Sequence, residues 1–141
     1  MSADGIPEAS IVTDIAILSD LWEGLPEAES VVRRAVAAVA ARPDVAVPAE
    51  AELSLALSDD ATVQGLNRDY RAKDKPTNVL SFPAPHGPLL GDVIIAFETL
   101  TREAAEEQLT PADHLAHLTI HGLLHLLGYD HETEAEALRM E

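Results

Sequence analysis

The alternation of apolar and polar residues along the chain predicts four β-strands. The strand segments are residues 11–18, 52–57, 78–82 and 92–97, which are short apolar or alternating runs bounded by turn residues. A stretch rich in proline and glycine, residues 83–88, joins the last two segments. This arrangement predicts a hairpin.

Helical spacing of apolar residues predicts helices between and after these strands. They cover residues 29–41, a segment from a cap among residues 58–60 to Arg71, residues 98–108, and a helix with Thr110 as N-cap and Pro111 at its first position. Residues 132–141 also have a helical pattern. The order of elements predicts an α/β (α+β) fold: a single domain over residues 1–141, with a mixed four-stranded sheet packed with helices. A length of 141 residues with 47% hydrophobic content suits one such core.

Three histidines near the end of the chain have the spacing of a metal site. His121 and His125 are four residues apart on the last predicted helix, so they lie on one face, about 40° apart around the axis. His131 can join them only if the helix ends first, and Gly128 favours that end because glycine readily adopts the left-handed conformation that terminates helices. Two histidines at this spacing also occur by chance, but the third favours a zincin-like metal helix with one Zn2+ per chain.

Three ligands indicate a catalytic metal, because they leave a fourth position for water or substrate. The spacing matches that of metzincin proteases, which place a general-base glutamate directly after the first histidine. This chain has Gly122 there, so a metalloprotease is disfavoured. His117 shares the face of His121, and a packing or supporting role fits it better than that of a fourth ligand, which would close the site.

The composition limits the other classes of protein. The chain has no cysteine, which excludes disulfides and thiolate ligands, so histidines must carry any zinc site. Its first ten residues lack the pattern of a secretory signal, and no apolar run approaches the roughly 20 residues of a membrane-spanning helix. We therefore expect a soluble, cytoplasmic protein without a membrane partner.

The net charge of −16 argues at first against a nucleic-acid partner, since polyphosphate binding usually relies on basic residues. Four of the nine basic residues nevertheless fall within eight positions, and both lysines are among them: Arg68, Arg71, Lys73 and Lys75. From charge alone, this cluster is more typical of a solvated turn after a helix.

Three segments, in order, resemble the YbeY family of bacterial endoribonucleases. The first is residues 67–83, which contain Tyr70-Arg71-Ala72-Lys73-Asp74; the second is Leu90-Gly91-Asp92; and the third runs from His121 to His131. The resemblance covers roughly residues 52–134. It implies a zinc-dependent, single-strand-specific endoribonuclease that acts in 16S rRNA 3′ end maturation and ribosome quality control. It also implies single-stranded RNA and the small ribosomal subunit with its proteins as partners.

The resemblance assigns roles to particular residues. His121, His125 and His131 match the metal ligands, and Arg71 matches the family's functional arginine. A guanidinium is a planar fork that fits phosphate oxygens, so Arg71 is expected to bind the scissile phosphate and stabilise charge in the transition state. The other three cations, Arg68, Lys73 and Lys75, are then expected to bind neighbouring phosphates.

Several alternatives stay open at the level of sequence. The protein could be a non-catalytic ribosome assembly factor in which zinc only holds the helix end; a metalloprotease is the third candidate. The attacking nucleophile, either water or the 2′-hydroxyl of the substrate, and the oligomeric state are also open. Family members usually continue further after the histidine motif, whereas this chain ends ten residues after His131, so a short or truncated C-terminal helix is expected.

Overall fold

The apolar segments build a mixed four-stranded sheet of β1 (Ile11–Ile17), β2 (Ala51–Ser58), β3 (Val79–Pro83) and β4 (Leu89–Ala96). The structure is a computed structural model that describes residues 11–73, 77–85 and 87–129. The strand order is β1-β2-β4-β3, in which β1, β2 and β4 are parallel and β3 is antiparallel to β4. The predicted mixed sheet and its hairpin are confirmed.

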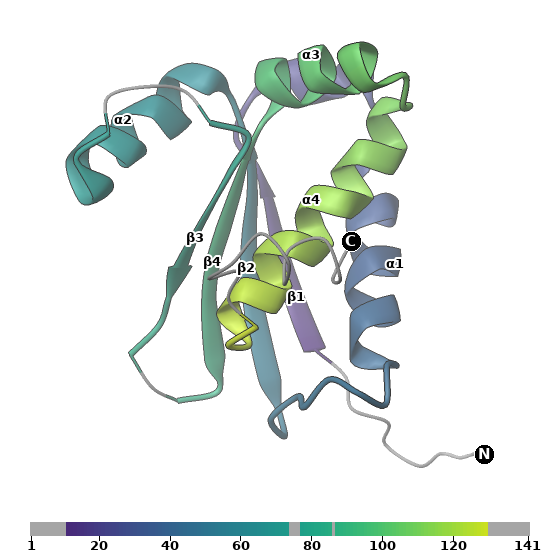
Figure 1. The fold of residues 1–141 in the computed structure, drawn as a ribbon, viewed down its shortest axis with the longest axis vertical. Helices are drawn as coiled ribbons and strands as arrows, with labels where there is room; N and C mark the ends of the chain where they lie inside the picture. The colour runs from purple at the N-terminus through teal and green to yellow at the C-terminus, as the bar shows by residue number, and fades with distance from the viewer. Residues whose placement is uncertain (1–10, 74–76, 86, 130–141) are drawn as a thin grey trace.

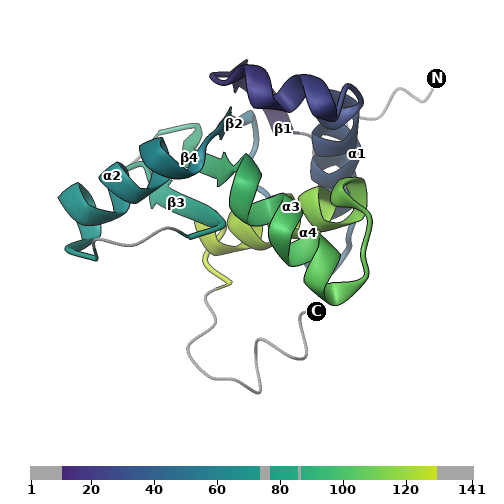
Figure 2. The ribbon, with the colours of Figure 1, turned by 90° about the horizontal axis from the view of Figure 1, so that it is seen from above.

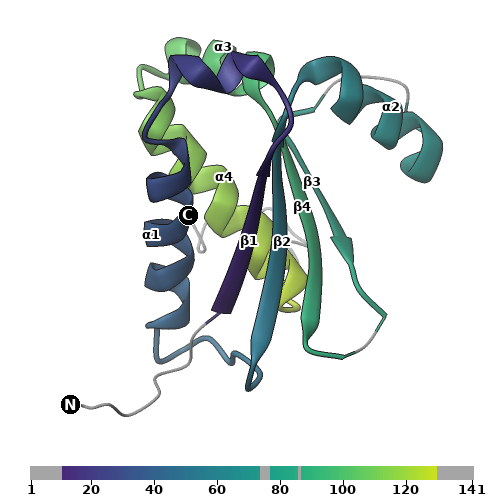
Figure 3. The same cartoon turned by 180° about the vertical axis from the view of Figure 1, so that it is seen from behind.

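Four α-helices surround the sheet: α1 (Ala28–Ala40), α2 (Asp60–Arg71), α3 (Phe97–Glu107) and α4 (Pro111–Leu126). Helices α1 and α4 pack on one face of the sheet, where α4 crosses it obliquely (Figure 1); from behind, the strands lie in front of α4, and α1 stands beside β1 (Figure 3). Seen from above, α2 lies on the side of the molecule away from α1 (Figure 2). These helices confirm the predicted ones to within a residue or two. The helix predicted over residues 132–141 lies outside the described residues.

The main core lies between the sheet and the α1/α4 layer. Along β2 the side chains alternate, and Leu53, Leu55 and Leu57 are each at most 1% exposed. They cluster with Val93 and Ile95 of β4 and with apolar residues of α1 and α4. Within the described ranges, none of the helices has the length and apolar character needed to cross a membrane.

A second, smaller core holds α2 against the other face of the sheet. Val63 of α2 clusters with Leu80 of β3 and Ala96 of β4, and Phe82 and Ile94 pack around them. Because side chains alternate along a strand, the residues beside these on β3 and β4 face α4 instead. Strand β3, an edge strand of the sheet, therefore has α2 on one face and α4 on the other.

A short 3-10 helix, Asp20–Gly24, precedes α1 and was not predicted from the sequence. Trp22 within it is 2% exposed, and its indole Nε1 donates a hydrogen bond to the Ser58 carbonyl at 2.8 Å. Its ring meets that of Phe97 edge-on, with ring centroids 5.0 Å apart. Five residues are too few for a periodic pattern, so only tertiary packing reveals this element.

Helices α2 and α3 begin beside each other and cap one another. Asp60 Oδ1 accepts hydrogen bonds from the Thr99 backbone N–H at 3.0 Å and the Thr99 hydroxyl at 2.8 Å. In return, Glu98 Oε1 accepts one from the Asp60 N–H at 2.8 Å. Each helix therefore satisfies a backbone donor in the first turn of the other, and Asp60 replaces the side-chain cap that Ala96 cannot supply to α3.

Asp59 is the N-cap of α2, and we expect Asp59→Ala to lower the free energy of unfolding by about 1 kcal/mol near pH 7. The Thr62 backbone N–H donates to its carboxylate at 2.8 Å, and this bond lowers the pKa of Asp59 below its ordinary value of 3.8. A pKa lowered by folding means that the stabilisation is complete above the unfolded-state value and is lost as the pH falls through the folded-state value.

Urea unfolding near pH 7 and at about pH 2 measures this effect. Asp59→Asn is the matched control, because asparagine caps a helix about as well as aspartate but does not titrate. We expect the wild-type protein to lose stability relative to this control on acidification. Parallel losses in the two proteins would contradict the role of the Asp59 charge.

Candidate active site

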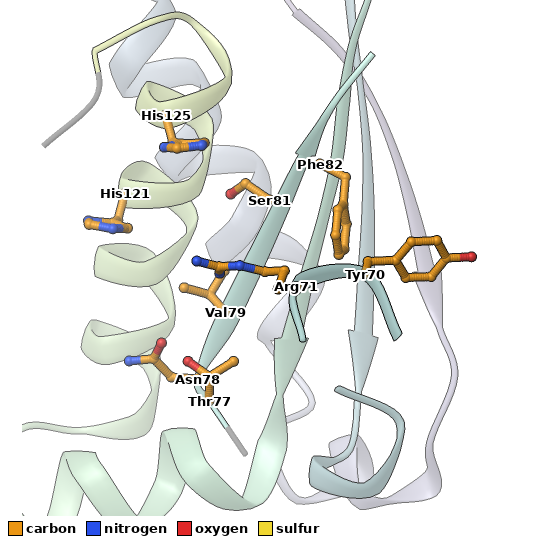
Figure 4. Close-up of a pocket in the computed structure, with 9 residues that line it drawn as sticks. All are labelled: Tyr70, Arg71, Thr77, Asn78, Val79, Ser81, Phe82, His121 and His125. Carbon is orange, nitrogen blue, oxygen red and sulfur yellow. The ribbon is translucent and has the colours of Figure 1, made fainter. Parts of the chain in front are cut away.

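A pocket of about 470 Å3 lies at the outer edge of β3, between the end of α2 and α4. Its lining comes from the last turn of α2, from the segment that leads into β3 and from α4: Tyr70, Arg71, Thr77, Asn78, Val79, Ser81, Phe82, His121 and His125. Figure 4 shows the Arg71 side chain extending past β3 toward α4, whereas Tyr70 points away from α4. The pocket therefore brings the predicted arginine and two of the predicted histidines together.

Helix α4 presents its two histidines to this pocket. The helix begins as predicted, with Pro111 in its first turn and the Thr110 hydroxyl accepting a hydrogen bond from the Asp113 N–H at 3.0 Å. His121 and His125 are one helical turn apart, and both are half-buried. Both imidazoles therefore form part of the wall of the same pocket.

The helix stop that the third ligand requires is present. Gly128 has a φ of +96°, and its N–H donates to the His125 carbonyl at 3.1 Å. The Tyr129 N–H donates to the Leu124 carbonyl at 2.9 Å, which completes the turn. The chain thus leaves the helix axis after Leu127, as predicted; His131 itself lies outside the described residues.

The donors in the pocket fit a metal such as zinc. Imidazole nitrogen is a common zinc ligand, and a pair at this spacing can share one ion. In the part of the chain that the structure describes, no group of three or more histidine, cysteine, aspartate or glutamate side chains is placed to hold a metal. His121 and His125 could hold a metal there only together with a ligand from outside these ranges.

Gly122 has a packing function that the sequence comparison with proteases could not reveal. The residue is buried, and a Cβ atom added to it would lie 3.0 Å from Val93 Cγ1 and 3.2 Å from the Ser81 hydroxyl. Ser81 also donates a hydrogen bond to the Gly122 carbonyl at 3.4 Å. Position 122 therefore faces the sheet, and glycine there lets α4 lie close to β3 and β4.

Arg71 is placed by the way α2 ends. Ala72 adopts a left-handed conformation with φ of 59°, its N–H donates to the Arg68 carbonyl, and the Lys73 N–H donates to the Asn67 carbonyl. This turn ends the helix directly after Arg71. The arginine side chain is exposed and lines the pocket.

The other three predicted cations are not brought into the pocket by the described structure. Arg68 is exposed, and its Nε lies 3.0 Å from Asp69 Oδ1. Lys73 is exposed beyond the helix end, and neither residue lines the pocket. Lys75 lies outside the described residues.

A partly buried polar network next to the pocket was not predicted. Glu103 Oε1 lies 2.9 Å from both Asn78 Nδ2 and His114 Nε2, and His114 is 4% exposed. The ring of His117 stacks on that of His114 with centroids 5.9 Å apart, in agreement with the packing role expected for His117. The glutamate lies on α3, the two histidines on α4 and the asparagine just before β3, so they give no sequence signal, because only the fold brings them together.

Comparisons with known proteins find the same family over nearly the whole chain. Residues 23–141 match the family model described as Endoribonuclease YbeY. A protein named Endoribonuclease YbeY from Bradyrhizobium sp. is 50% identical over 147 residues, covering 96% of this chain and 86% of the relative. Proteins of the same name from Nitrobacter winogradskyi and Azorhizobium caulinodans are 49% and 51% identical, covering 96% and 91% of this chain and 76% and 84% of their own lengths. A solution structure from Thermotoga maritima, 28% identical, aligns over 89% of this chain and 83% of its own with a TM-score of 0.49.

Proposed function

Because the chain belongs to the endoribonuclease YbeY family, we propose that the pocket beside β3 is where it cleaves single-stranded RNA. In this proposal His121, His125 and His131 hold one Zn2+, and Arg71 binds the scissile phosphate. The metal-dependent ribonuclease domain extends over residues 1–141. The observation that carries the proposal is that Arg71 and two of the three histidines line the same pocket.

The proposed chemistry divides between the two sides of the pocket. Arg71 presents parallel N–H donors to two phosphate oxygens, which fixes the orientation of the phosphodiester and opposes the negative charge that grows during cleavage. When bound, a zinc ion supplies a positive charge that polarises a phosphoryl oxygen. Arg68 and Lys73 are exposed cations, and together with Lys75, which follows them in the sequence, they would bind the neighbouring phosphates.

The acidic surface supports a narrow path for RNA. With 25 acidic and 9 basic residues, most of the protein repels a polyphosphate, so the RNA is expected to approach along the edge where the cluster of cations follows α2. This favours binding of a short stretch of strand around one scissile bond over binding along an extended basic surface.

We place this activity in the cytoplasm, in maturation of the 16S rRNA 3′ end and in ribosome quality control, with the small ribosomal subunit as partner. The support is the family resemblance of the three sequence segments. The relatives carry the name of an endoribonuclease, which favours a nuclease over a non-catalytic assembly factor or a protease.

Arg71→Ala tests the phosphate-binding half of the site. We expect it to lower kcat/KM on a defined single-stranded RNA by about 100-fold, because it removes charge stabilisation that is strongest in the transition state. Arg71→Lys should recover part of this loss, since lysine keeps the charge but not the planar fork. The measurement is cleavage of an end-labelled RNA by zinc-loaded protein, with analysis of the product ends.

Arg33→Ala is the control. Arg33 is an exposed arginine on α1 that forms an ion pair with Glu29 of the same helix, and neither residue lines the pocket. We expect it to cleave at the wild-type rate. Full activity of Arg71→Ala would contradict the proposed role. A cyclic phosphate at the product end would identify the 2′-hydroxyl as the nucleophile.

A further inference from the structure

Two of the five aromatic residues, the exposed Tyr70 and the half-buried Phe82, form a pair at the pocket that the proposed chemistry does not use. Tyr70 is 71% exposed, the highest value for a large hydrophobic side chain among the described residues. Its ring meets that of Phe82 edge-on, with centroids 5.8 Å apart. The remaining aromatics have partners within the fold: Trp22 and Phe97 pack on each other, and the Tyr129 hydroxyl accepts a hydrogen bond from the Ala46 N–H.

This pair, which we term the aromatic platform, lies where two cavities meet. Tyr70 and Phe82 line the pocket that contains Arg71 and the histidines. They also line a second groove of about 350 Å3 on the α2 side of the sheet, together with Leu66, Asp92 and Ile94. The platform is the part of the lining that the two cavities share. A ligand in the first pocket can therefore extend into the groove only past these two rings.

The neighbouring positions of Tyr70 and Arg71 explain this geometry. Consecutive residues on a helix point about 100° apart. At the end of α2, the Arg71 side chain therefore extends toward α4, whereas the Tyr70 side chain points away from α4 (Figure 4). A phosphate held by Arg71 would thus have the aromatic platform beside it. In a nucleic-acid strand, the group next to a phosphate is a nucleoside.

The chemistry of the groove selects a base and disfavours a second phosphate. Its lining is apolar except for Asp92, whose carboxylate repels phosphate. Asp92 is the cross-strand partner of Phe82, so the two side chains are neighbours on the same face of the hairpin. Aromatic rings stack on unpaired bases, and a carboxylate accepts a hydrogen bond from the amino group of cytosine or adenine, which uracil lacks.

We propose that Tyr70 and Phe82 stack on the unpaired base next to the scissile phosphate, and that Asp92 favours cytosine or adenine over uracil at that position. This inference rests on the proposed ribonuclease function. It adds a reason for single-strand specificity, because a base in a duplex is already stacked and paired and is not available to the platform. Tyr70 is a positioning residue here, and its effect should fall mainly on KM.

The test compares two single-stranded RNAs that differ only at the nucleotide beside the cleaved bond. In the first RNA this nucleotide carries its base; in the second RNA it is abasic. We expect the wild-type protein to have about a tenfold lower KM for the RNA with the base. Tyr70→Ala should raise KM for that RNA about tenfold and leave KM for the abasic RNA unchanged. Tyr70→Phe, which keeps a stacking ring, should remain within about twofold of wild type.

Binding of the same RNAs, measured by fluorescence anisotropy, and thermal unfolding of each variant separate the possible outcomes. A loss in Tyr70→Ala that is equal for both RNAs would indicate a structural effect and overturn the proposed base site. Cleavage by the wild type with an unchanged KM in Tyr70→Ala would overturn the base site alone. RNA that the wild type neither binds nor cleaves would overturn the ribonuclease function as well. Asp92→Ala should remove the preference for cytosine or adenine over uracil, and its persistence would contradict the role of Asp92.

Discussion

Replacing His125 by alanine is expected to abolish zinc binding at one equivalent and to reduce RNA cleavage at least about a thousandfold. The expectation follows from the proposed three-ligand site: loss of one imidazole would leave two protein ligands, and a catalytic metal contributes several kcal/mol of charge stabilisation. Metal content by mass spectrometry and cleavage of a labelled RNA measure the two effects separately. A chelator should reproduce the loss in the wild type, and added zinc should restore it.

His117→Ala is the matched control, since His117 is an exposed histidine one turn before His121 that stacks on His114 and does not line the pocket. It should retain one zinc ion and cleave RNA within a few-fold of wild type. If His125→Ala cleaved RNA at the wild-type rate without metal, zinc would have no catalytic role. Loss of metal in His117→Ala but not in His125→Ala would show that His117, rather than His125, is the ligand that accompanies His121 on this face of α4.

Gly91→Ala is expected to lower the free energy of unfolding by about 3 kcal/mol. Gly91 has a φ of +148°, a conformation that residues with a Cβ rarely adopt. An added Cβ would also clash with the Phe82 carbonyl oxygen across the hairpin, and would lie 2.9 Å from Leu126 Cδ2 of α4. Urea unfolding followed by circular dichroism measures the change.

Gly65→Ala provides the control because it adds the same methyl group within α2, where the nearest atom to the new Cβ is the end of a flexible arginine at 3.7 Å. Alanine is the better helix former, so this variant should be more stable than wild type by roughly 0.5–1 kcal/mol. Equal stability of Gly91→Ala and the wild type would show that the hairpin tolerates a side chain there.

Most of the fold could be predicted because its elements carry local patterns. The alternation in β2 and the cap and proline that open α4 depend on neighbouring residues alone, and their predicted bounds hold to within one or two residues. The 3-10 helix around Trp22 has no such pattern. Its stability comes from contacts with Ser58 and Phe97, which are distant in the sequence.

The candidate site divides in the same way. The spacing of His121 and His125 and the stop at Gly128 are local, so sequence reasoning could place them on one helix face with a turn after it. The contributions of Ser81, Phe82 and Asn78 depend on where β3 passes α4, which no short-range pattern encodes. Gly122 illustrates the difference: compared with a protease motif it lacks a carboxylate, whereas in the fold it is a contact point between helix and sheet.

The reciprocal bonds between Asp60 and α3 have a mechanical consequence for the distance across the pocket. They hold the first residue of α2 against α3, and Val63 packs on the sheet one turn further along the helix, whereas Arg71 is the last residue of α2. A helix of 12 residues is about 18 Å long, so a tilt of about 10° at Asp60 would move Arg71 by about 3 Å. The contacts of Asp60 and Val63 at the start of α2 therefore fix the direction of the helix, and with it the distance between Arg71 and the histidines of α4.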